Sequence, residues 1–162
     1  MARYSDVVEG LRAGMRRLVS SVSVVSLADQ AGNRYAMTAT SVTSLSDNPA
    51  SLLVCINKSA SSFPHLKAGA NFCVNVLAAN QQEISILCAG GSDGEDRFQK
   101  GNWIALNNVP YLVDAEANFF CENAAVHEYG THIIVIGKLI EVLTADGVVN
   151  PLLYADGSYR TL

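Results

Sequence analysis

Small hydroxyl side chains are concentrated in the stretch "MTATSVTSLSDNP", residues 37–49, whose neighbours in the sequence are strongly apolar. One interpretation is a half-exposed strand, because threonine is a good β-former. The other is that a polar, planar ligand lies against the strand. Hydroxyl groups can donate and accept hydrogen bonds without adding charge, so both interpretations remain open from the residues alone.

A second polar cluster, "NKSASS" at 57–62, follows the apolar run "LLVCI" and precedes a predicted helix. Free amides at the start of a helix, with hydroxyls beside them, bind anions and phosphate in particular. The alternative is that Ser61 or Ser62 only caps the helix.

The motifs of several enzyme classes are missing. The chain has no G-x-G-x-x-G, no Walker-type phosphate loop, no H-E-x-x-H and no G-x-S-x-G. Four widely spaced cysteines in apolar contexts are predicted to be reduced core residues, and three scattered histidines give no ligand spacing, so no metal site is predicted. Catalysis, if present, would be carried by a cofactor.

Hydrophobic periodicity predicts an N-terminal amphipathic helix followed mainly by strands. Over residues 6–18 a capping-box pattern precedes apolar residues at three- and four-residue steps. Short helices are expected at 61–68 and 81–89, the second followed by the loop "AGGSDGED". Strands are expected at 20–27, 34–43, 51–57, 71–77, 116–128 and 131–143, with turns at 29–33 and "EYGT" and a final hairpin around 156–157.

These elements predict one domain, 1–162, built as a closed or nearly closed barrel with flanking helices. Only 16% of the residues are charged, which suggests that another chain or a ligand covers part of the surface. A net charge of −4 without a basic cluster argues against nucleic acid. The apolar runs are too short to span a membrane and the start lacks a signal-peptide pattern, so we expect a cytoplasmic protein.

Four pieces of sequence in order carry a family resemblance. They are "MTATSVTSLSDNPASLLVCINKSASSFPHLKAGANFCVNVL", "DRF", "THIIVIGKLIEV" and "PLLYADGSY", within about 15–159. The chain resembles the flavin reductase-like, FMN-binding split-barrel proteins, which include small reductase components of two-component flavin monooxygenases. The resemblance implies a mainly β, antiparallel, Greek-key-like split barrel with short helices. It also implies a homodimer with flavin near the subunit interface.

The resemblance also implies a binding site made from the two hydroxyl clusters. The segment along the flavin ring would contain Thr38, Ala39, Thr40, Ser41 and Ser44. The ribityl chain and phosphate would be held by Cys55, Ile56, Asn57, Ser59, Ser61 and Ser62. The hydroxyls of the opening stretch would then replace water around a bound flavin.

Two further residues match the family at single positions. His132 occupies the place of the histidine in the family's G-D-H, where it faces flavin and nicotinamide. Here the triplet is Gly130, Thr131, His132, so the acid-base role of His132 stays open.

Arg97 matches the "RF" after the acidic loop and would contact a phosphate, unless it is only a solvated arginine. Phe98, Gly137 and Tyr159 are assigned to packing, Gly137 because it suggests a bulge or a close backbone approach.

The function predicted from this resemblance is an NAD(P)H-dependent flavin reductase that supplies reduced FMN or FAD to a partner monooxygenase. One alternative is a flavoprotein that reduces a bound acceptor such as a cob(II) corrinoid. A second is a non-enzymatic flavin- or haem-binding barrel, with haem disfavoured because His132 lacks an obvious second ligand. The sequence leaves FMN against FAD, and NADH against NADPH, undecided.

Overall fold

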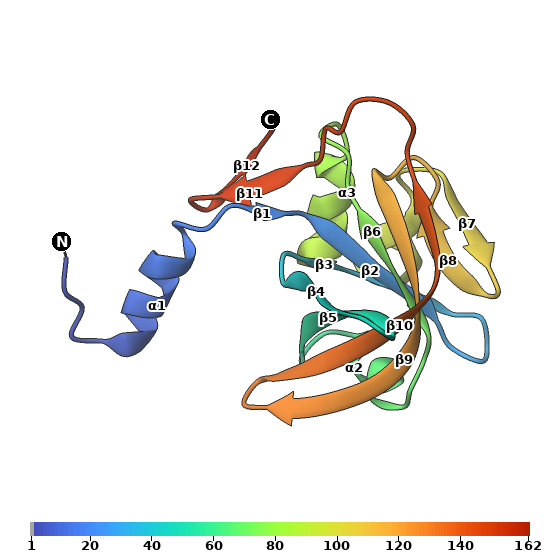
Figure 1. Ribbon diagram of the computed structural model, residues 1–162, viewed down its shortest axis with the longest axis horizontal. Helices are drawn as coiled ribbons and strands as arrows, with labels where there is room; N and C mark the ends of the chain where they lie inside the picture. The colour runs from blue at the N-terminus through green and yellow to red at the C-terminus, as the bar shows by residue number, and fades with distance from the viewer. Residues whose placement is uncertain (1) are drawn as a thin grey trace.

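A seven-stranded antiparallel sheet forms the centre of the computed structural model, which describes residues 2–162 (Figure 1). The sheet is strongly curled, so that its two edge strands approach each other. This confirms the predicted mainly β, split-barrel class. In spatial order the strands are β3 (Arg34–Ala39), β2 (Ser23–Ala28), β6 (Phe72–Val76), β9 (Ala117–Tyr129), β10 (His132–Thr144), β5 (Ala50–Asn57) and β4 (Val42–Asp47).

The two edge strands, β3 and β4, are consecutive in the chain and meet at a corner at Thr40 and Ser41. The prediction of one strand over 34–43 is therefore wrong at residues 40–41, where β3 ends and β4 has not yet begun. The Ser41 hydroxyl donates to the Cys55 carbonyl (3.0 Å) and accepts from the Cys55 N–H (3.3 Å). This side chain therefore fastens the corner to the backbone of β5. Before the corner, β3 pairs with β2, and after it, β4 pairs with β5.

Two smaller sheets flank the barrel. The predicted strand 20–27 is divided into β1 (Ser20–Ser21) and β2, and β1 pairs with the C-terminal hairpin of β11 (Leu153–Ala155) and β12 (Ser158–Arg160). That final hairpin was predicted correctly. The hairpin of β7 (Trp103–Leu106) and β8 (Val109–Leu112) was not predicted.

The predicted short helices are present at nearly the predicted positions. They are α2 (Phe63–Lys67) and α3 (Gln82–Ile86), the latter continuing into a π-helical turn, η1 (Leu87–Gly91). The predicted acidic loop contains a 3-10 turn, η2 (Gly94–Phe98). The turns η1 and η2 pack against β3, and Arg97 of η2 bonds its free edge, so both help to shape the candidate site.

The core consists of two main apolar clusters. One joins six strands of the sheet to α2, and the other joins β2 and β3 to α3, β8 and the C-terminal segment. Gly137 lies at a register shift in β10, where an added Cβ would be 2.7 Å from both Cys121 and Phe72. The predicted close backbone approach at Gly137 is therefore confirmed.

The N-terminal helix α1 (Val7–Met15) stands apart from the barrel (Figure 1). Asp6 caps it by accepting a hydrogen bond from the Val8 N–H (2.8 Å). The predicted apolar stripe exists, but it is not packed: Leu11 is 61% exposed and Met15 is 55% exposed. No helix in residues 2–162 combines the length and apolar character needed to cross a bilayer.

Candidate functional site

The free edge of β3 is covered by Arg97. Its Nη1 donates to the Ala36 carbonyl (2.6 Å) and its Nε to the Ser92 carbonyl (2.9 Å), which leaves the side chain only 11% exposed. Backbone groups alternate sides along a strand, so the N–H and C=O of Thr38 face the same edge as the Ala36 carbonyl. Arg97 therefore fixes the loop over β3 and places a cation at this edge.

The loop after β5 approaches the same cation. Arg97 Nη1 lies 3.5 Å from the Ser61 hydroxyl, and no acceptor in residues 2–162 bonds the Ser61 N–H. Asn57 Oδ1 accepts from the N–H and the hydroxyl of Ser59, both at 2.9 Å. Helix α2 has only five residues, so local amides and Arg97, rather than a helix dipole, would attract an anion.

The hydroxyls of the first cluster fall into two groups. Thr38 donates to the Ser85 carbonyl (2.6 Å), and Ser41 bonds Cys55, so both position backbone. Thr40 and Ser44 are exposed, and no hydrogen bond of their hydroxyls is formed within residues 2–162. The hydroxyls of Thr40 and Ser44 can therefore still donate and accept hydrogen bonds with a ligand.

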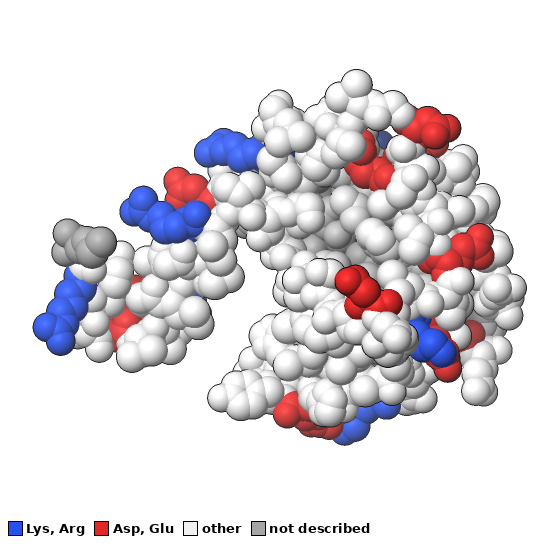
Figure 2. Space-filling model, viewed as in Figure 1, with Lys and Arg blue, Asp and Glu red and all other residues white. Residues whose placement is uncertain are grey.

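Two hollows that share the lining residues Thr40 and Tyr154 lie beside this corner. One, of about 250 Å³, is lined by Thr38, Thr40, Ser85 and Tyr159 among others. The other, of about 440 Å³, shares Thr40 with it and runs beneath the apolar side of α1. Figure 2 shows a broad notch between α1 and the barrel whose walls are mostly uncharged. A largely apolar groove with a few convergent hydroxyls suits a planar, weakly charged ring.

Several predicted site residues lie mainly in the core. Ala39, Ile56 and Ser62 are buried, and Cys55 is half-buried. The Ser62 hydroxyl contacts Met37 Sδ at 3.2 Å. The side chains of these three buried residues are packed in the protein interior, whereas the exposed hydroxyls of Thr40 and Ser61 are open to a ligand.

His132 lies at the start of β10, opposite Asn57 in the β5–β10 pairing. The β9–β10 hairpin therefore places the predicted imidazole next to the predicted phosphate loop. Lys58 N–H donates to the Thr131 carbonyl (3.0 Å), which fastens the hairpin tip to that loop. The Thr131 hydroxyl lies 2.8 Å from His132 Nδ1, a contact that sequence reasoning did not identify.

Three of the four thiols are unsuited to act as nucleophiles, and the fourth, Cys55, is half-buried. Cys73, Cys88 and Cys121 are buried, as predicted, and burial raises the pKa of Cys88 and of Cys121 to about 12. Residues 2–162 contain no cluster of three or more His, Cys, Asp or Glu side chains arranged for a metal ion. The groups present are those of a binding site.

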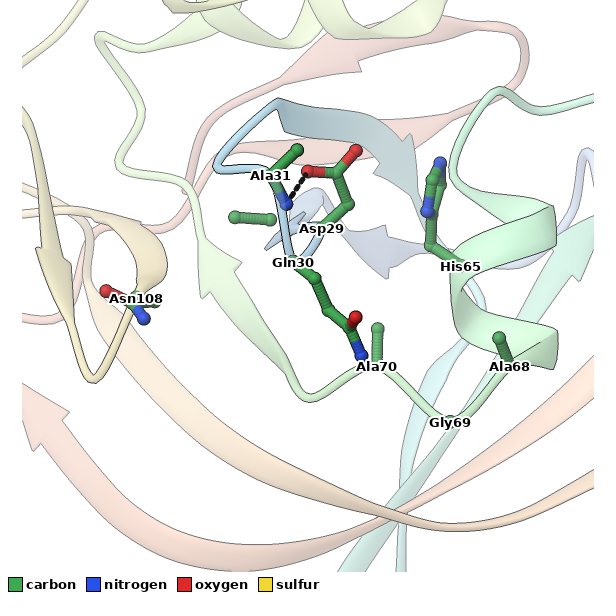
Figure 3. Close-up of a pocket in the computed structure, with 9 residues that line it drawn as sticks. Asp29, Gln30, Ala31, His65, Ala68, Gly69, Ala70 and Asn108 are labelled. Atoms are coloured by element: carbon green, nitrogen blue, oxygen red, sulfur yellow. Dashed lines mark hydrogen bonds between the residues drawn. The ribbon is translucent and has the colours of Figure 1, made fainter.

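A further hollow of about 600 Å³ lies at the other end of β3 and contains none of the predicted site residues (Figure 3). Its carboxylate, Asp29, accepts from the N–H groups of Ala31 and Asn33, both at 2.9 Å, and from the Asn33 side chain. These bonds, chiefly that of the Asn33 side chain, lower the pKa of Asp29. Asp29 thus stabilises the β2–β3 turn.

Comparison with known proteins identifies the family. The family profile described as "Flavin reductase like domain" matches residues 15–162. The chain belongs to this family. It is 38% identical over 89 residues to an NADH-dependent FMN reductase of Agrobacterium fabrum, covering 54% of this chain and 51% of that protein. It is 36% identical over 86 residues to the reductase component of an FADH₂-dependent resorcinol hydroxylase of a Rhizobium species, covering 52% and 48%.

The similarity extends over the whole fold in the solved structures. The NADH:FAD oxidoreductase of Streptomyces globisporus, determined with NAD and FAD fragments, superposes with a TM-score of 0.88 at 28% identity, covering 98% of this chain and 96% of that one. By contrast, the alignments to the two curated relatives span about half of their length. The fold and the family are thus established for nearly the whole chain.

Proposed function

We propose that this flavin reductase family member uses NADH to reduce FMN or FAD. The observation that carries the proposal is the hollow beside Thr38 and Thr40, together with Arg97, which bonds Ala36 on the same strand and lies 3.5 Å from the Ser61 hydroxyl. The neutral hydroxyls suit the ring, and the guanidinium of Arg97, whose carboxylate partner Asp93 is 3.8 Å away and exposed, suits the phosphate. The named activities of the two relatives and of the solved structure support it.

The residues of this chain would bind and orient the reactants. When bound, the flavin supplies the redox chemistry, accepting a hydride from the nicotinamide and a proton from water. Thr40 and Ser44 would hydrogen-bond the ring, Ser59, Ser61 and Arg97 would hold the phosphate, and the remaining predicted residues would form the wall of the site. His132 would lie at the ligand from the hairpin side. Catalysis would then come mainly from positioning and exclusion of water.

The test is anaerobic mixing of the purified protein with flavin and NADH while the visible spectrum is recorded. We expect loss of the long-wavelength flavin band at a rate proportional to protein concentration. A rate equal to that of flavin and NADH without protein would refute the proposal. Repeating the experiment with NADPH, and with FMN and FAD in turn, determines the preferred pair.

We also propose that the chain works as a homodimer in the cytoplasm and passes reduced flavin to a monooxygenase. An isolated helix of nine residues is marginal in water, so the exposed apolar face of α1 needs a partner. The groove beneath α1 includes Thr40 of the candidate site, which suggests that a second copy completes that site. Four free cysteines support a reducing compartment. The hydroxylase relative supports the monooxygenase partner.

A further inference from the structure

The tip of the β9–β10 hairpin holds a threonine and a histidine in direct contact. Gly130 adopts a positive φ of 52° and allows the two-residue turn to close. Thr131 Oγ1 then lies 2.8 Å from His132 Nδ1, and this is the hydrogen bond of the imidazole within residues 2–162. Contact between these two side chains is therefore built into the turn.

The backbone on both sides of this contact is fixed. The Thr131 carbonyl accepts from the Lys58 N–H (3.0 Å), and His132 is paired with Asn57 on one side and Tyr129 on the other. A β-branched side chain also has few χ1 rotamers. The hydroxyl is thus presented to the ring by a restrained backbone and a restrained side chain.

The charged groups near the hairpin tip are already paired with each other. On β9, Glu128 bonds Lys58 Nζ (2.8 Å) and Lys67 Nζ (2.7 Å), and these bonds lower the pKa of Glu128 to about 2. The remaining titratable neighbours on β9 are His127 and Tyr129. No carboxylate in residues 2–162 bonds the His132 ring, so its polar partner is neutral.

We propose that Thr131 is a positioning residue that donates its hydroxyl proton to Nδ1 and holds His132 in the tautomer protonated at Nε2. A hydroxyl can donate to an unprotonated Nδ1 as well as accept from a protonated one, whereas a carboxylate can only accept and would require a proton on Nδ1; a threonine at this place therefore permits the Nε2 tautomer that an acid would disfavour. In that tautomer Nε2 carries the ring proton of the neutral imidazole and can donate it to a ligand. The assignment to flavin reduction rests on the proposed function; the tautomer itself does not.

The test uses ring ¹⁵N NMR shifts of the labelled protein without flavin at a pH where the imidazole is neutral, with His132→Gln identifying the His132 signals. We expect the shift of a protonated Nε2 in the wild type and in Thr131→Ser. Thr131→Val should move the tautomer ratio toward that of a free imidazole. Thr131→Asp should place the proton on Nδ1. Thr144→Val, the same substitution at the exposed far end of β10, should change nothing.

A wild-type ring protonated mainly on Nδ1 would overturn the proposal, as would identical ratios in the wild type and Thr131→Val with unchanged melting temperatures. In the reductase assay we expect Thr131→Val to lower kcat/KM by roughly 2- to 10-fold, the range for one hydrogen bond, and Thr131→Ser to restore it. If the wild type does not reduce flavin, the proposed function fails, but the ring shifts still decide the tautomer.

Discussion

The individual hydroxyls of the candidate site differ in what they can still bind. Ser41 and Thr38 are bonded to backbone carbonyls, and Ser62 is buried against a methionine. Ser61 is exposed and its hydroxyl lies 3.5 Å from Arg97 Nη1, so a phosphate bound there could contact both the hydroxyl and the guanidinium. A ligand-binding test should therefore begin at Ser61.

Ser61→Asp should weaken flavin binding about tenfold or more at low salt, because the new carboxylate opposes the phosphate and competes for Arg97. The loss should shrink as salt is added. Titration of flavin fluorescence measures both effects. Thr161→Asp, which adds the same charge at an exposed position near the C-terminus, serves as the control. Equal affinities of Ser61→Asp and the wild type would remove Ser61 from the site.

Residue types indicated the hydroxyl clusters, but they could not indicate which hydroxyls remain free. The bond of Ser41 to Cys55 depends on a corner that brings β5 alongside, and the bond of Thr38 to Ser85 depends on the position of α3. Both partners are distant in sequence. The Thr131–His132 contact is local, and the order Gly-Thr-His at a predicted tight turn could have indicated it.

At the scale of elements, hydrophobic periodicity predicted most of the strands. Gly137 in β10 allows this strand to pack closely against Cys121 of β9 and Phe72 of β6. Gly137→Ala should lower the free energy of unfolding by about 1–3 kcal/mol, because the added methyl group would overlap Cys121 and Phe72. Urea denaturation measures the change. Gly14→Ala is the control: nothing lies within 4 Å of its added Cβ, and alanine favours a helix over glycine, so we expect no loss of stability and a gain of at most about 1 kcal/mol. Equal stabilities of the Gly137→Ala variant and the wild type would contradict the close approach.

The β9–β10 hairpin is tied to the loop after β5 and to α2 through Glu128. Hydrogen bonds from Lys58 and then Lys67 lower the pKa of this carboxyl from 4.5 to about 2. A lowered native pKa stabilises the folded state above about pH 4.5, and this stabilisation is lost as the pH falls through about 2. Between these values the wild type should lose more stability than Glu128→Gln. Chemical denaturation at several pH values measures this, with Glu141→Gln as the control. If the stability of Glu128→Gln fell with pH in parallel with that of the wild type, Glu128 would not stabilise the fold through Lys58 and Lys67.

Two elements show the limits of prediction from sequence. The β7–β8 hairpin was missed because Pro110 and small residues obscure alternation, although Asn107 and Asn108, both with positive φ, form the kind of two-residue turn that marks a hairpin. For α1, the sequence correctly predicted the helix and its apolar stripe, but it did not indicate that this stripe would be exposed in the single chain. An apolar stripe shows that a helix needs a partner, but it does not say whether the partner belongs to the same chain.

At the scale of the whole molecule, the proposed homodimer can be tested at the exposed apolar stripe of α1, which lies over the groove that includes Thr40. Val8→Asp should raise the dimer dissociation constant at least about tenfold, because a charge would enter an apolar contact. An acidic residue in the first turn favours the helix itself, so loss of the dimer would not reflect loss of α1. Val148→Asp, at a 93% exposed loop residue, is the matched control.

Sedimentation velocity measures the dimer, and the reductase assay at matched concentrations measures the consequence. Because Thr40 lines the groove that α1 covers, dissociation should expose the candidate ring site to water and lower the affinity for flavin together with the turnover. Dilution of the wild type should produce the same loss, and excess protein should restore the activity of Val8→Asp. A wild type that sediments as a monomer with full activity would show that one copy forms the complete site, and α1 would then need a different partner.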